Sequence, residues 1–169
     1  LREQLNGWKT TLRVSDIADL GPARENEEVV LCDLSDMDAV QKLVEDCDGI
    51  IHLGGVSTEN TFENILNANI RGTYNIYEAA RKAGVPRILF ASSNHTIGFH
   101  ERETRLDANA AMRPDSLYGV SKCFGESLSR YYYDKFAIET ACVRIGSSFP
   151  KPLNRRMLAT WLSFEDLTA

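Results

Sequence analysis

The sequence predicts an α/β protein built on a doubly wound, mostly parallel β-sheet. Short apolar strands alternate along the chain with amphipathic helices, and this order is typical of right-handed crossovers between parallel strands. Several strands end in polar or glycine-rich residues, and the carboxyl ends of parallel strands are where such sheets bind ligands. The 169 residues are 43% hydrophobic and 25% charged, which is ordinary for a globular domain.

Three strands and two helices are predicted in the first half of the chain. The strands are short and rich in apolar and β-branched residues, and they are 11–17, 29–34 and 49–55. The helices carry apolar residues at helical spacing, as at Val40, Leu43 and Val44, and they are 36–47 and 61–83. The second helix should end at Gly84, because Pro86 lies just beyond it and glycine favours the left-handed conformation that ends a helix.

The same alternation continues in the second half. Strands are predicted at 87–93 and 139–147, with a polar stretch from Asn94 to Asp115 and a helix over about 116–136 between them. A short helix is predicted over 155–162. Ser163 is followed by acidic residues, which predicts the start of another helix.

Composition excludes several function classes. The net charge is -5, and acidic and basic residues are interspersed, so no nucleic-acid or membrane surface is indicated. The four cysteines, Cys32, Cys47, Cys123 and Cys142, show no C-x-x-C spacing, and we interpret them as reduced thiols of a cytoplasmic protein. There is no metal-ligand motif, no signal peptide and no apolar run of about 18 residues.

The stretch "DSLYGVSKCFGE" carries the main chemical signal. Tyr118 and Lys122 are four residues apart and share a helix face. A tyrosine is a poor base at neutral pH, but a neighbouring ammonium favours the phenolate and is expected to lower the tyrosine's pKa. Ser93, at the end of a predicted strand, supplies a hydroxyl that completes a proton-transfer set.

The same spacing recurs at Tyr131 and Lys135, so the Y-x-x-x-K pattern alone is a weak signal. The first pair is surrounded by Gly119, Ser121 and Gly125, whose small side chains would let a cofactor approach closely. The second pair lies on a different face of the helix and follows no strand-end serine. We therefore assign the second pair to packing and solvent.

Nearly the whole chain resembles the extended short-chain dehydrogenase/reductase (NAD-dependent epimerase/dehydratase) superfamily and, within it, the NAD-dependent uronate dehydrogenases. The resemblance rests on "CDLSDMDAV", "GIIHLGG", "NIRGTYNIYEAAR", "RILFASSNHTIG", "RPDSLYGVSKCFGE" and "VRIGS…NRRML". The sharpest marker is "SSNHTIG". Sugar-nucleotide epimerases and dehydratases usually have a small residue after the serines and a tyrosine before the glycine, where this chain has Asn94-His95 and Ile97.

The resemblance implies a Rossmann-like fold and a domain division. Residues 1–150 would form an NAD-binding domain truncated at its N-terminus, and residues 151–169 would begin a substrate-binding C-terminal region. A glycine-rich turn that binds the pyrophosphate should precede Asp16 by about 20 residues. Only 15 residues precede Asp16 and none forms such a turn, so we expect a fragment that lacks the first strand, binds NAD weakly alone, and belongs to a longer enzyme.

NAD is the expected cofactor. Asp16 ends its strand and can accept hydrogen bonds from both hydroxyls of an adenosine ribose, while its charge would repel the 2′-phosphate of NADP. The resemblance implies further cofactor contacts at Asp33, Leu34, Leu53, Gly54, Gly55, Tyr118 and Lys122. It also implies that Asn69 bends its helix and helps to order a proton-relay water, although a surface asparagine is the alternative.

A uronate substrate needs a cationic anchor for its carboxylate. Arg156, which matches the family's "N-x-R-M-L" segment where the neighbouring Arg155 does not, is the candidate, because a guanidinium binds a carboxylate through two hydrogen bonds. Two solvated arginines at a helix start are the alternative. Short polar groups expected to bind sugar hydroxyls are Ser57, Ser93, Asn94, His95, Tyr118 and Ser147. His52 is expected to be structural, His100 receives no role, and a buried, hydrogen-bonded His95 is the alternative to a substrate contact.

The reaction implied is oxidation of the anomeric carbon of glucuronate or galacturonate. Tyr118, assisted by Lys122, would take the anomeric hydroxyl proton while Ser93 steadies the oxygen and hydride passes to NAD, giving an aldarolactone. The alternatives are a sugar-nucleotide epimerase or dehydratase, against which "SSNHTIG" counts, and a dinucleotide-sensing regulator, which would usually lack the Tyr/Lys pair. A homo-oligomer is expected by analogy, through helices including the predicted helix over 116–136.

Overall fold

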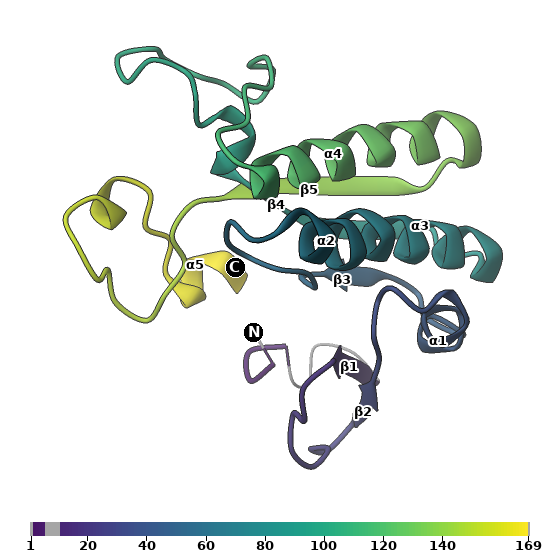
Figure 1. The fold of residues 1–169 in the computed structure, drawn as a ribbon. Helices are drawn as coiled ribbons and strands as arrows, with labels where there is room; N and C mark the ends of the chain where they lie inside the picture. The colour runs from purple at the N-terminus through teal and green to yellow at the C-terminus, as the bar shows by residue number, and fades with distance from the viewer. Residues whose placement is uncertain (1, 6–10, 169) are drawn as a thin grey trace. The chain divides into compact units, whose positions relative to one another are not determined.

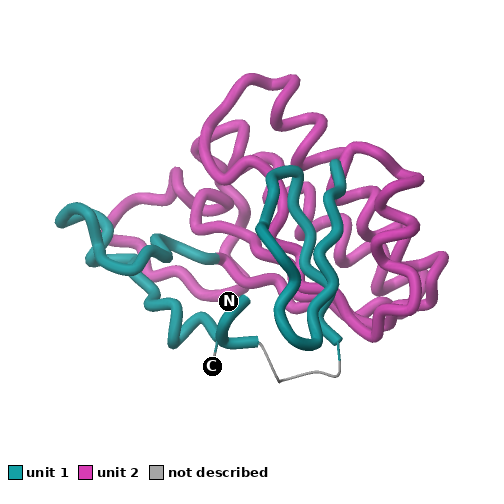
Figure 2. Tube along the Cα trace, turned by 90° about the horizontal axis from the view of Figure 1, so that it is seen from below, with its two compact units in different colours: residues 1–33, 145–169 teal, residues 34–144 magenta. Residues whose placement is uncertain are grey.

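The computed structural model describes residues 2–5 and 11–168, so part of the predicted 1–150 domain lies outside the described residues. The chain divides into two compact units, residues 1–33 with 145–169 and residues 34–144 (Figure 2). Each unit is described by itself.

The first unit contains a two-stranded parallel sheet. Its strands are β1 (Leu12–Asp16) and β2 (Glu27–Leu31), paired in the register Val14↔Val29. The backbone continues this pairing after β2, where the amide of Cys32 donates to the carbonyl of Asp16 at 3.1 Å. Both predicted strands are confirmed, and each is shorter than its apolar run.

The C-terminal part of this unit differs from the prediction of a helix over 155–162. Only a 3₁₀ turn, η3 (Met157–Ala159), forms there. Trp161 instead pairs with Ser147 in a parallel bridge, with Leu162 N donating to Ser147 O at 2.9 Å, and this extended backbone is incompatible with a helix. The helix expected after Ser163 is present as α5 (Phe164–Thr168), and the Ser163 hydroxyl accepts from Asp166 N at 3.0 Å.

The second unit carries a three-stranded sheet in the order β3-β4-β5 (Figure 1). The strands are β3 (Ile50–His52), β4 (Arg87–Ser93) and β5 (Glu139–Ile145), and β3 and β4 run parallel with His52 beside Phe90. The helices are α1 (Met37–Leu43), α2 (Phe62–Ile65), α3 (Gly72–Ala83) and α4 (Leu117–Phe136), with a 3₁₀ turn η2 (Asn94–Ile97) after β4. This order confirms the α/β fold class with parallel strand pairing.

The long helix predicted over 61–83 is interrupted. A π-helical segment, η1 (Leu66–Arg71), separates α2 from α3. The whole helical stretch begins at α2 with a threonine cap, because the Thr61 hydroxyl accepts from Asn64 N, and it ends after α3 at Gly84 with a φ of 74°. Both predicted ends are confirmed. Asn69 lies inside the π segment and is buried.

Helix α4 packs against α3 and against strand β4. The rings of Tyr77 and Tyr132 lie 5.3 Å apart between centroids, and both side chains are buried. The phenol of Tyr132 also donates to Glu78 at 3.0 Å. This packing fixes α4, and with it the predicted Tyr/Lys pair, beside the carboxyl end of β4.

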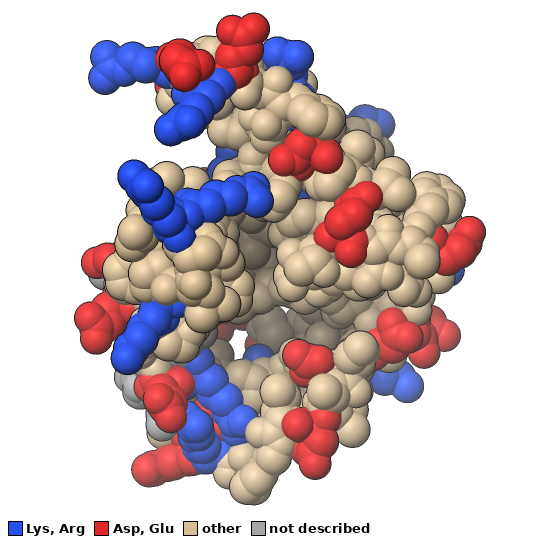
Figure 3. Space-filling view, turned by 60° about the vertical axis from the view of Figure 1, so that its left-hand side comes forward, with Lys and Arg blue, Asp and Glu red and all other residues tan. Residues whose placement is uncertain are grey.

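The charged side chains on the face drawn in Figure 3 include both signs. Among the residues that the structure describes, no helix is both long enough and apolar enough to cross a membrane.

Candidate active site

Tyr118 lies in the first turn of α4, and every amide of that turn has an acceptor. Ser116 caps the helix, with its hydroxyl accepting from Gly119 N at 2.9 Å and its carbonyl accepting from Val120 N at 2.9 Å. The carboxylate of Glu59 accepts from Tyr118 N at 3.0 Å and from Leu117 N at 3.2 Å. A helix normally leaves its first amides without partners, so this complete set fixes the backbone of Tyr118.

The Tyr118 side chain meets Ser93, the last residue of β4. Both residues are buried, with Tyr118 8% exposed. Burial raises the pKa of the Tyr118 phenol, and the nearby Ser93 hydroxyl offsets part of that rise. The phenol and the strand-end hydroxyl are therefore close enough to interact, and their joint role stays a prediction.

Lys122 lies one turn further along α4 and is only 6% exposed. Its ammonium donates to the carbonyl of Ala91 at 2.8 Å and stands 5.6 Å from the centroid of the Tyr118 ring. Burial lowers the pKa of Lys122 to about 8. The expectation that Lys122 lowers the pKa of Tyr118 is not met here, because burial of the phenol dominates and the ammonium is directed to a backbone carbonyl.

The second Tyr/Lys pair lies on the surface. Tyr131 is 48% exposed, and the Lys135 ammonium stands 5.6 Å from the centroid of its ring. Tyr131 also packs edge-on against Phe136. These contacts agree with its interpretation as packing and solvent.

Asn69 lies in the π segment and is hydrogen-bonded through its whole amide. Its Oδ1 accepts from Val56 N at 2.8 Å, and its Nδ2 donates to Val56 O at 2.9 Å and to the Ser121 hydroxyl at 2.9 Å. The Ser121 hydroxyl in turn donates to Tyr118 O at 2.7 Å. Asn69 therefore joins the loop after β3 to the helix that carries Tyr118.

Two glycines after β3, Gly54 and Gly55, stand where a side chain would meet a neighbouring residue. Gly55 has a φ of 124°, and a Cβ there would stand 2.8 Å from Asn69 Oδ1. A Cβ at Gly54 would overlap the side chain of Leu34. Both glycines and Leu53 are exposed on their other side. A bare, outward-facing backbone of this kind fits the close approach of a dinucleotide.

The histidines differ in their surroundings. His52 is buried, its Nε2 is 3.2 Å from the Thr73 hydroxyl, and burial lowers its pKa to about 3, which agrees with a structural role. His95 follows Ser93 in η2, and its ring packs edge-on against Tyr118 with centroids 5.6 Å apart. Its Nδ1 is 2.8 Å from Asp115 Oδ1, and its ring is partly exposed. Asn94 accepts from the Ser93 hydroxyl at 3.4 Å.

The remaining predicted residues belong to loops or to the first unit. Ser57 is exposed in the loop after β3. Asp16 ends β1, where its carboxylate accepts from Ala18 N at 3.1 Å, and Asp33 follows β2. Ser147 forms the bridge with Trp161, and Arg156 is exposed immediately before η3. Asp16, Asp33, Ser147 and Arg156 belong to the first unit and Tyr118 to the second, and their share in one site stays a prediction.

Sequence reasoning missed Glu59, Asp115 and Ser121, which hold Tyr118 and His95 in place. Glu59 carries no signal, since it sits in a polar loop 59 residues before its partner. Asp115 directly precedes the helix cap, and Ser121 lies three residues after Tyr118 on the same helix, so both were visible only as neighbours of the pair.

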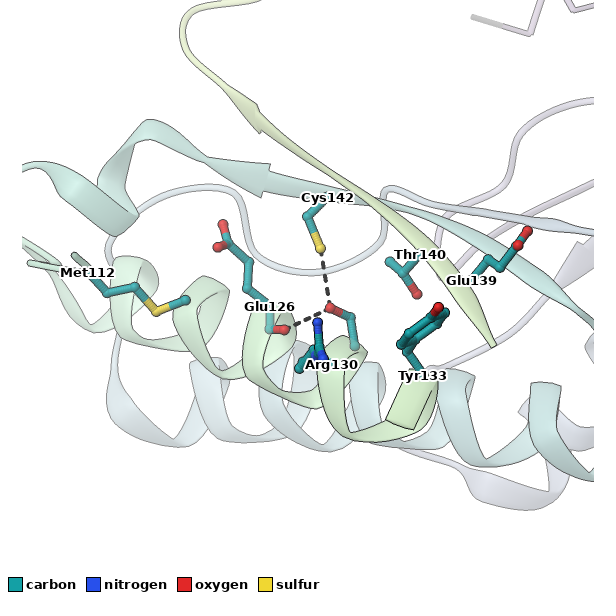
Figure 4. A pocket seen from close by; sticks show the side chains of 8 residues that line it. Met112, Glu126, Arg130, Tyr133, Glu139, Thr140 and Cys142 are labelled. Carbon is teal, nitrogen blue, oxygen red and sulfur yellow. Dashed lines mark hydrogen bonds between the residues drawn. The ribbon is translucent and has the colours of Figure 1, made fainter. Parts of the chain in front are cut away.

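A pocket of about 520 Å³ lies elsewhere, between α4 and β5 (Figure 4). Its lining includes Glu126, Arg130 and Tyr133 from α4 and Cys142 from β5, whose thiol is 3.4 Å from the Ser129 hydroxyl. It contains neither Tyr118 nor Ser93. Over the described part of the chain, no group of three His, Cys, Asp or Glu side chains is placed to hold a metal ion.

A model of the NAD dependent epimerase/dehydratase family matches residues 6–162. The chain belongs to this family. Among curated proteins it is similar to the uronate dehydrogenase of Pseudomonas putida, 59% identical over 168 residues, and to that of Agrobacterium fabrum, 57% identical over 169 residues. These alignments cover 99% and 100% of this chain but 63% and 64% of the relatives, so the chain spans less than two thirds of their length.

The chain is also similar to solved structures. A uronate dehydrogenase from Agrobacterium tumefaciens superposes with a TM-score of 0.95 at 57% identity, covering 99% of this chain and 63% of that one. A glucuronic acid dehydrogenase from Chromohalobacter salexigens gives 0.96 at 61% identity, covering 98% and 62%. A UDP-galactose 4-epimerase, at 19% identity and a TM-score of 0.82, shares the fold.

Proposed function

We propose that the full-length protein is an NAD-dependent dehydrogenase that oxidises the anomeric carbon of hexuronates to aldarolactones. One observation carries the proposal: a buried phenol, Tyr118, lies near the strand-end hydroxyl of Ser93 and beside the buried ammonium of Lys122. Together these groups can accept a proton from a substrate hydroxyl. The likeness to uronate dehydrogenases over almost the whole chain supports the choice of substrate.

NAD is the proposed cofactor. The proposed contacts are Asp16, Asp33, Leu34, Leu53, Gly54, Gly55, Tyr118 and Lys122. The bare backbone at Gly54 and Gly55 and the carboxylate at the end of β1 support this assignment. When bound, NAD supplies the acceptor for the hydride that leaves the substrate carbon.

The chain's own residues handle the proton. Tyr118, ionised as the phenolate, takes the proton of the anomeric hydroxyl and becomes the phenol, while Ser93 donates a hydrogen bond to the substrate oxygen and holds it near Tyr118. The ammonium of Lys122 stabilises the phenolate before it takes the proton, an effect that grows in a site shielded from water. Asn69 acts through its bonds to Val56 and Ser121 as a positioning residue.

The substrate would be held by its hydroxyls and its carboxylate. Arg156 is the proposed carboxylate anchor, and its exposed guanidinium is available for two parallel hydrogen bonds. The proposed hydroxyl contacts are Ser57, Ser93, Asn94, His95, Tyr118 and Ser147. Residues 151–169 would begin the substrate-binding region, after an NAD-binding domain within residues 1–150.

We also propose that the protein is a cytoplasmic homo-oligomer. Cys123 and Cys142 are free thiols, which suits a reducing compartment. Exposed aromatic residues along α4 supply apolar surface for pairing of subunits.

The test is NADH formation by the full-length protein supplied with NAD and either glucuronate or glucose. Reduction with glucuronate alone is expected, because only the uronate presents a carboxylate. Tyr118→Phe should lower turnover by about 100-fold or more while NAD binding is retained. No reduction with either sugar, in a protein that binds NAD, would reject the uronate reaction and favour a sugar-nucleotide substrate.

A further inference from the structure

Beside Tyr118 the structure holds a histidine and a carboxylate as a fixed pair. His95 Nδ1 is 2.8 Å from Asp115 Oδ1, and the two residues come from opposite ends of the polar stretch between β4 and α4. The His95 ring meets the Tyr118 ring edge-on at an interplanar angle of 73°. The backbone amide of His95 also donates to the Ser93 hydroxyl at 3.2 Å. The pair therefore touches both proposed proton-transfer residues.

Asp115 has little freedom to leave this position. Its amide donates to His95 O at 3.3 Å, and its Oδ1 accepts from the Ser116 hydroxyl at 3.2 Å. Its carboxylate packs over Gly98 so closely that a Cβ at that position would overlap it. The absence of a side chain at Gly98 is therefore what admits the carboxylate next to His95.

This contact fixes the chemistry of the histidine ring. An ionised carboxylate only accepts hydrogen bonds, so Nδ1 must carry a hydrogen. A neutral imidazole has a single N–H, and Nε2 is then left as a hydrogen-bond acceptor. Across residues 2–5 and 11–168, no hydrogen bond reaches His95 Nε2, and the side chain is 38% exposed.

We propose that Asp115 is a positioning residue that holds His95 with Nε2 as the acceptor for a hydroxyl of the sugar ring. The proposal rests on the uronate dehydrogenase function above and deepens it. A lone pair at Nε2 attracts a donor hydroxyl and repels a carboxylate. His95 would thus read a sugar hydroxyl beside the reacting carbon and would force the substrate's carboxylate to bind elsewhere.

The first test measures the ring itself. Nitrogen NMR of the histidine-labelled full-length protein at neutral pH should show His95 as the Nδ1–H tautomer. In Asp115→Ala this preference should be lost. Asp115→Asn keeps the side-chain size if the alanine variant fails to fold, and its amide can donate to Nδ1 and so admits the other tautomer. A wild-type His95 in the Nε2–H form would overturn the proposal.

The second test measures recognition. Deoxyfluoro uronates, each with one ring hydroxyl replaced by fluorine, lose a donor while keeping similar size. One of them should lose about tenfold in kcat/KM with the wild type, the scale of one hydrogen bond, and this loss should vanish in His95→Ala. Asp115→Ala should raise the uronate KM without changing NAD affinity, and should add nothing in the His95→Ala background.

A matched control is Asp107→Ala, in the same polar stretch, where among the described residues the carboxylate has one hydrogen-bond partner, Asn109 N at 2.8 Å. It should leave the tautomer and the uronate KM unchanged. Equal fluorine penalties in the wild type and His95→Ala would overturn the inference in an enzyme that still oxidises uronates. A wild type that oxidises no uronate would instead reject the proposed function.

Discussion

The Asn69 side chain makes hydrogen bonds to both backbone groups of Val56: its Oδ1 accepts from the Val56 amide at 2.8 Å, and its Nδ2 donates to the Val56 carbonyl at 2.9 Å. The same Asn69 amide reaches the Ser121 hydroxyl, which bonds Tyr118 O, while Glu59, three residues after Val56, bonds Tyr118 N. These contacts close a ring that begins and ends at the Tyr118 backbone. The ring joins the loop after β3 to α4, so the position of the phenol depends on residues far from it in sequence.

Replacing Asn69 by alanine should open this ring. The variant leaves Val56 N, Val56 O and the Ser121 hydroxyl without their partner, and we expect a loss of about 3 kcal/mol in the free energy of unfolding, measured with urea. Asn67→Ala is the control, because Asn67 lies in the same π segment and, within the described part of the chain, its side chain makes a single hydrogen bond, accepting from the exposed Arg71 at 2.8 Å. Equal effects of the two substitutions would contradict the role assigned to Asn69.

Glu59→Gln tests the other side of the ring. A neutral amide offers one acceptor in place of two and loses the favourable interaction of a negative charge with a helix N-terminus. We expect about 1 kcal/mol of lost stability, faster hydrogen exchange at the amides of Leu117 and Tyr118, and a kcat/KM for uronate lowered by about fivefold.

Glu63→Gln is the matched change for that experiment, since Glu63 is exposed in the first turn of α2. It should alter neither exchange at α4 nor turnover. Unchanged exchange at Leu117 and Tyr118 in Glu59→Gln would show that the carboxylate does not protect them.

The bounds of several elements could be predicted because their signals are local. Ser116 and Thr61 are helix caps, and Gly84 ends α3, so short-range chemistry marks these positions. The π segment around Asn69 could not be predicted from apolar periodicity, since that pattern carries no trace of the hydrogen bonds between the Asn69 amide and the backbone of Val56.

Part of the site could be predicted because its signals are also local. Tyr118 and Lys122 are four residues apart on one helix, and Ser93 ends a strand, so the sequence brings them into view together. The direction of the Tyr118 pKa shift depends on burial, which only the tertiary structure sets. Glu59 makes its contact across 59 residues, and no local pattern encodes that distance.

Glu126 lies one turn after Lys122, and its replacement should lower the free energy of unfolding more than replacement of an exposed charged residue of α4. Arg144 donates to both of its oxygens, at 2.9 and 2.8 Å, and the Ser92 hydroxyl also donates to it. Burial opposes the charge, but the hydrogen bonds from Arg144 and Ser92 hold the pKa of Glu126 below its ordinary value. Glu126→Ala would leave the mostly buried Arg144 unpaired.

We expect that variant to lose about 3 kcal/mol in the free energy of unfolding. Asp134→Ala is the control on the same helix, because it removes an exposed pair with Arg130, and should cost about 0.5 kcal/mol or less. Urea unfolding of both variants at neutral pH makes the comparison. A small effect at Glu126 would mean that water replaces the carboxylate beside Arg144.

Lys122→Met separates the stability cost of the buried ammonium from its chemical use. Burial lowers the pKa of Lys122 from its ordinary 10.5 to about 8, so between these pH values the unfolded chain binds a proton that the folded protein has released. The free energy of unfolding of the wild type should therefore rise with pH, relative to Lys122→Met, by up to about 1.4 kcal/mol per pH unit from pH 8 to about 10. Below pH 8 the difference should be constant and most favourable to the methionine variant, which should nevertheless have lost uronate oxidation.

Lys135→Met is the matched control for the loss of uronate oxidation, because it removes an exposed ammonium from the same helix. A difference in the free energy of unfolding between the wild type and Lys122→Met that does not vary with pH would mean that the Lys122 ammonium is hydrated in solution and that the site is open to water.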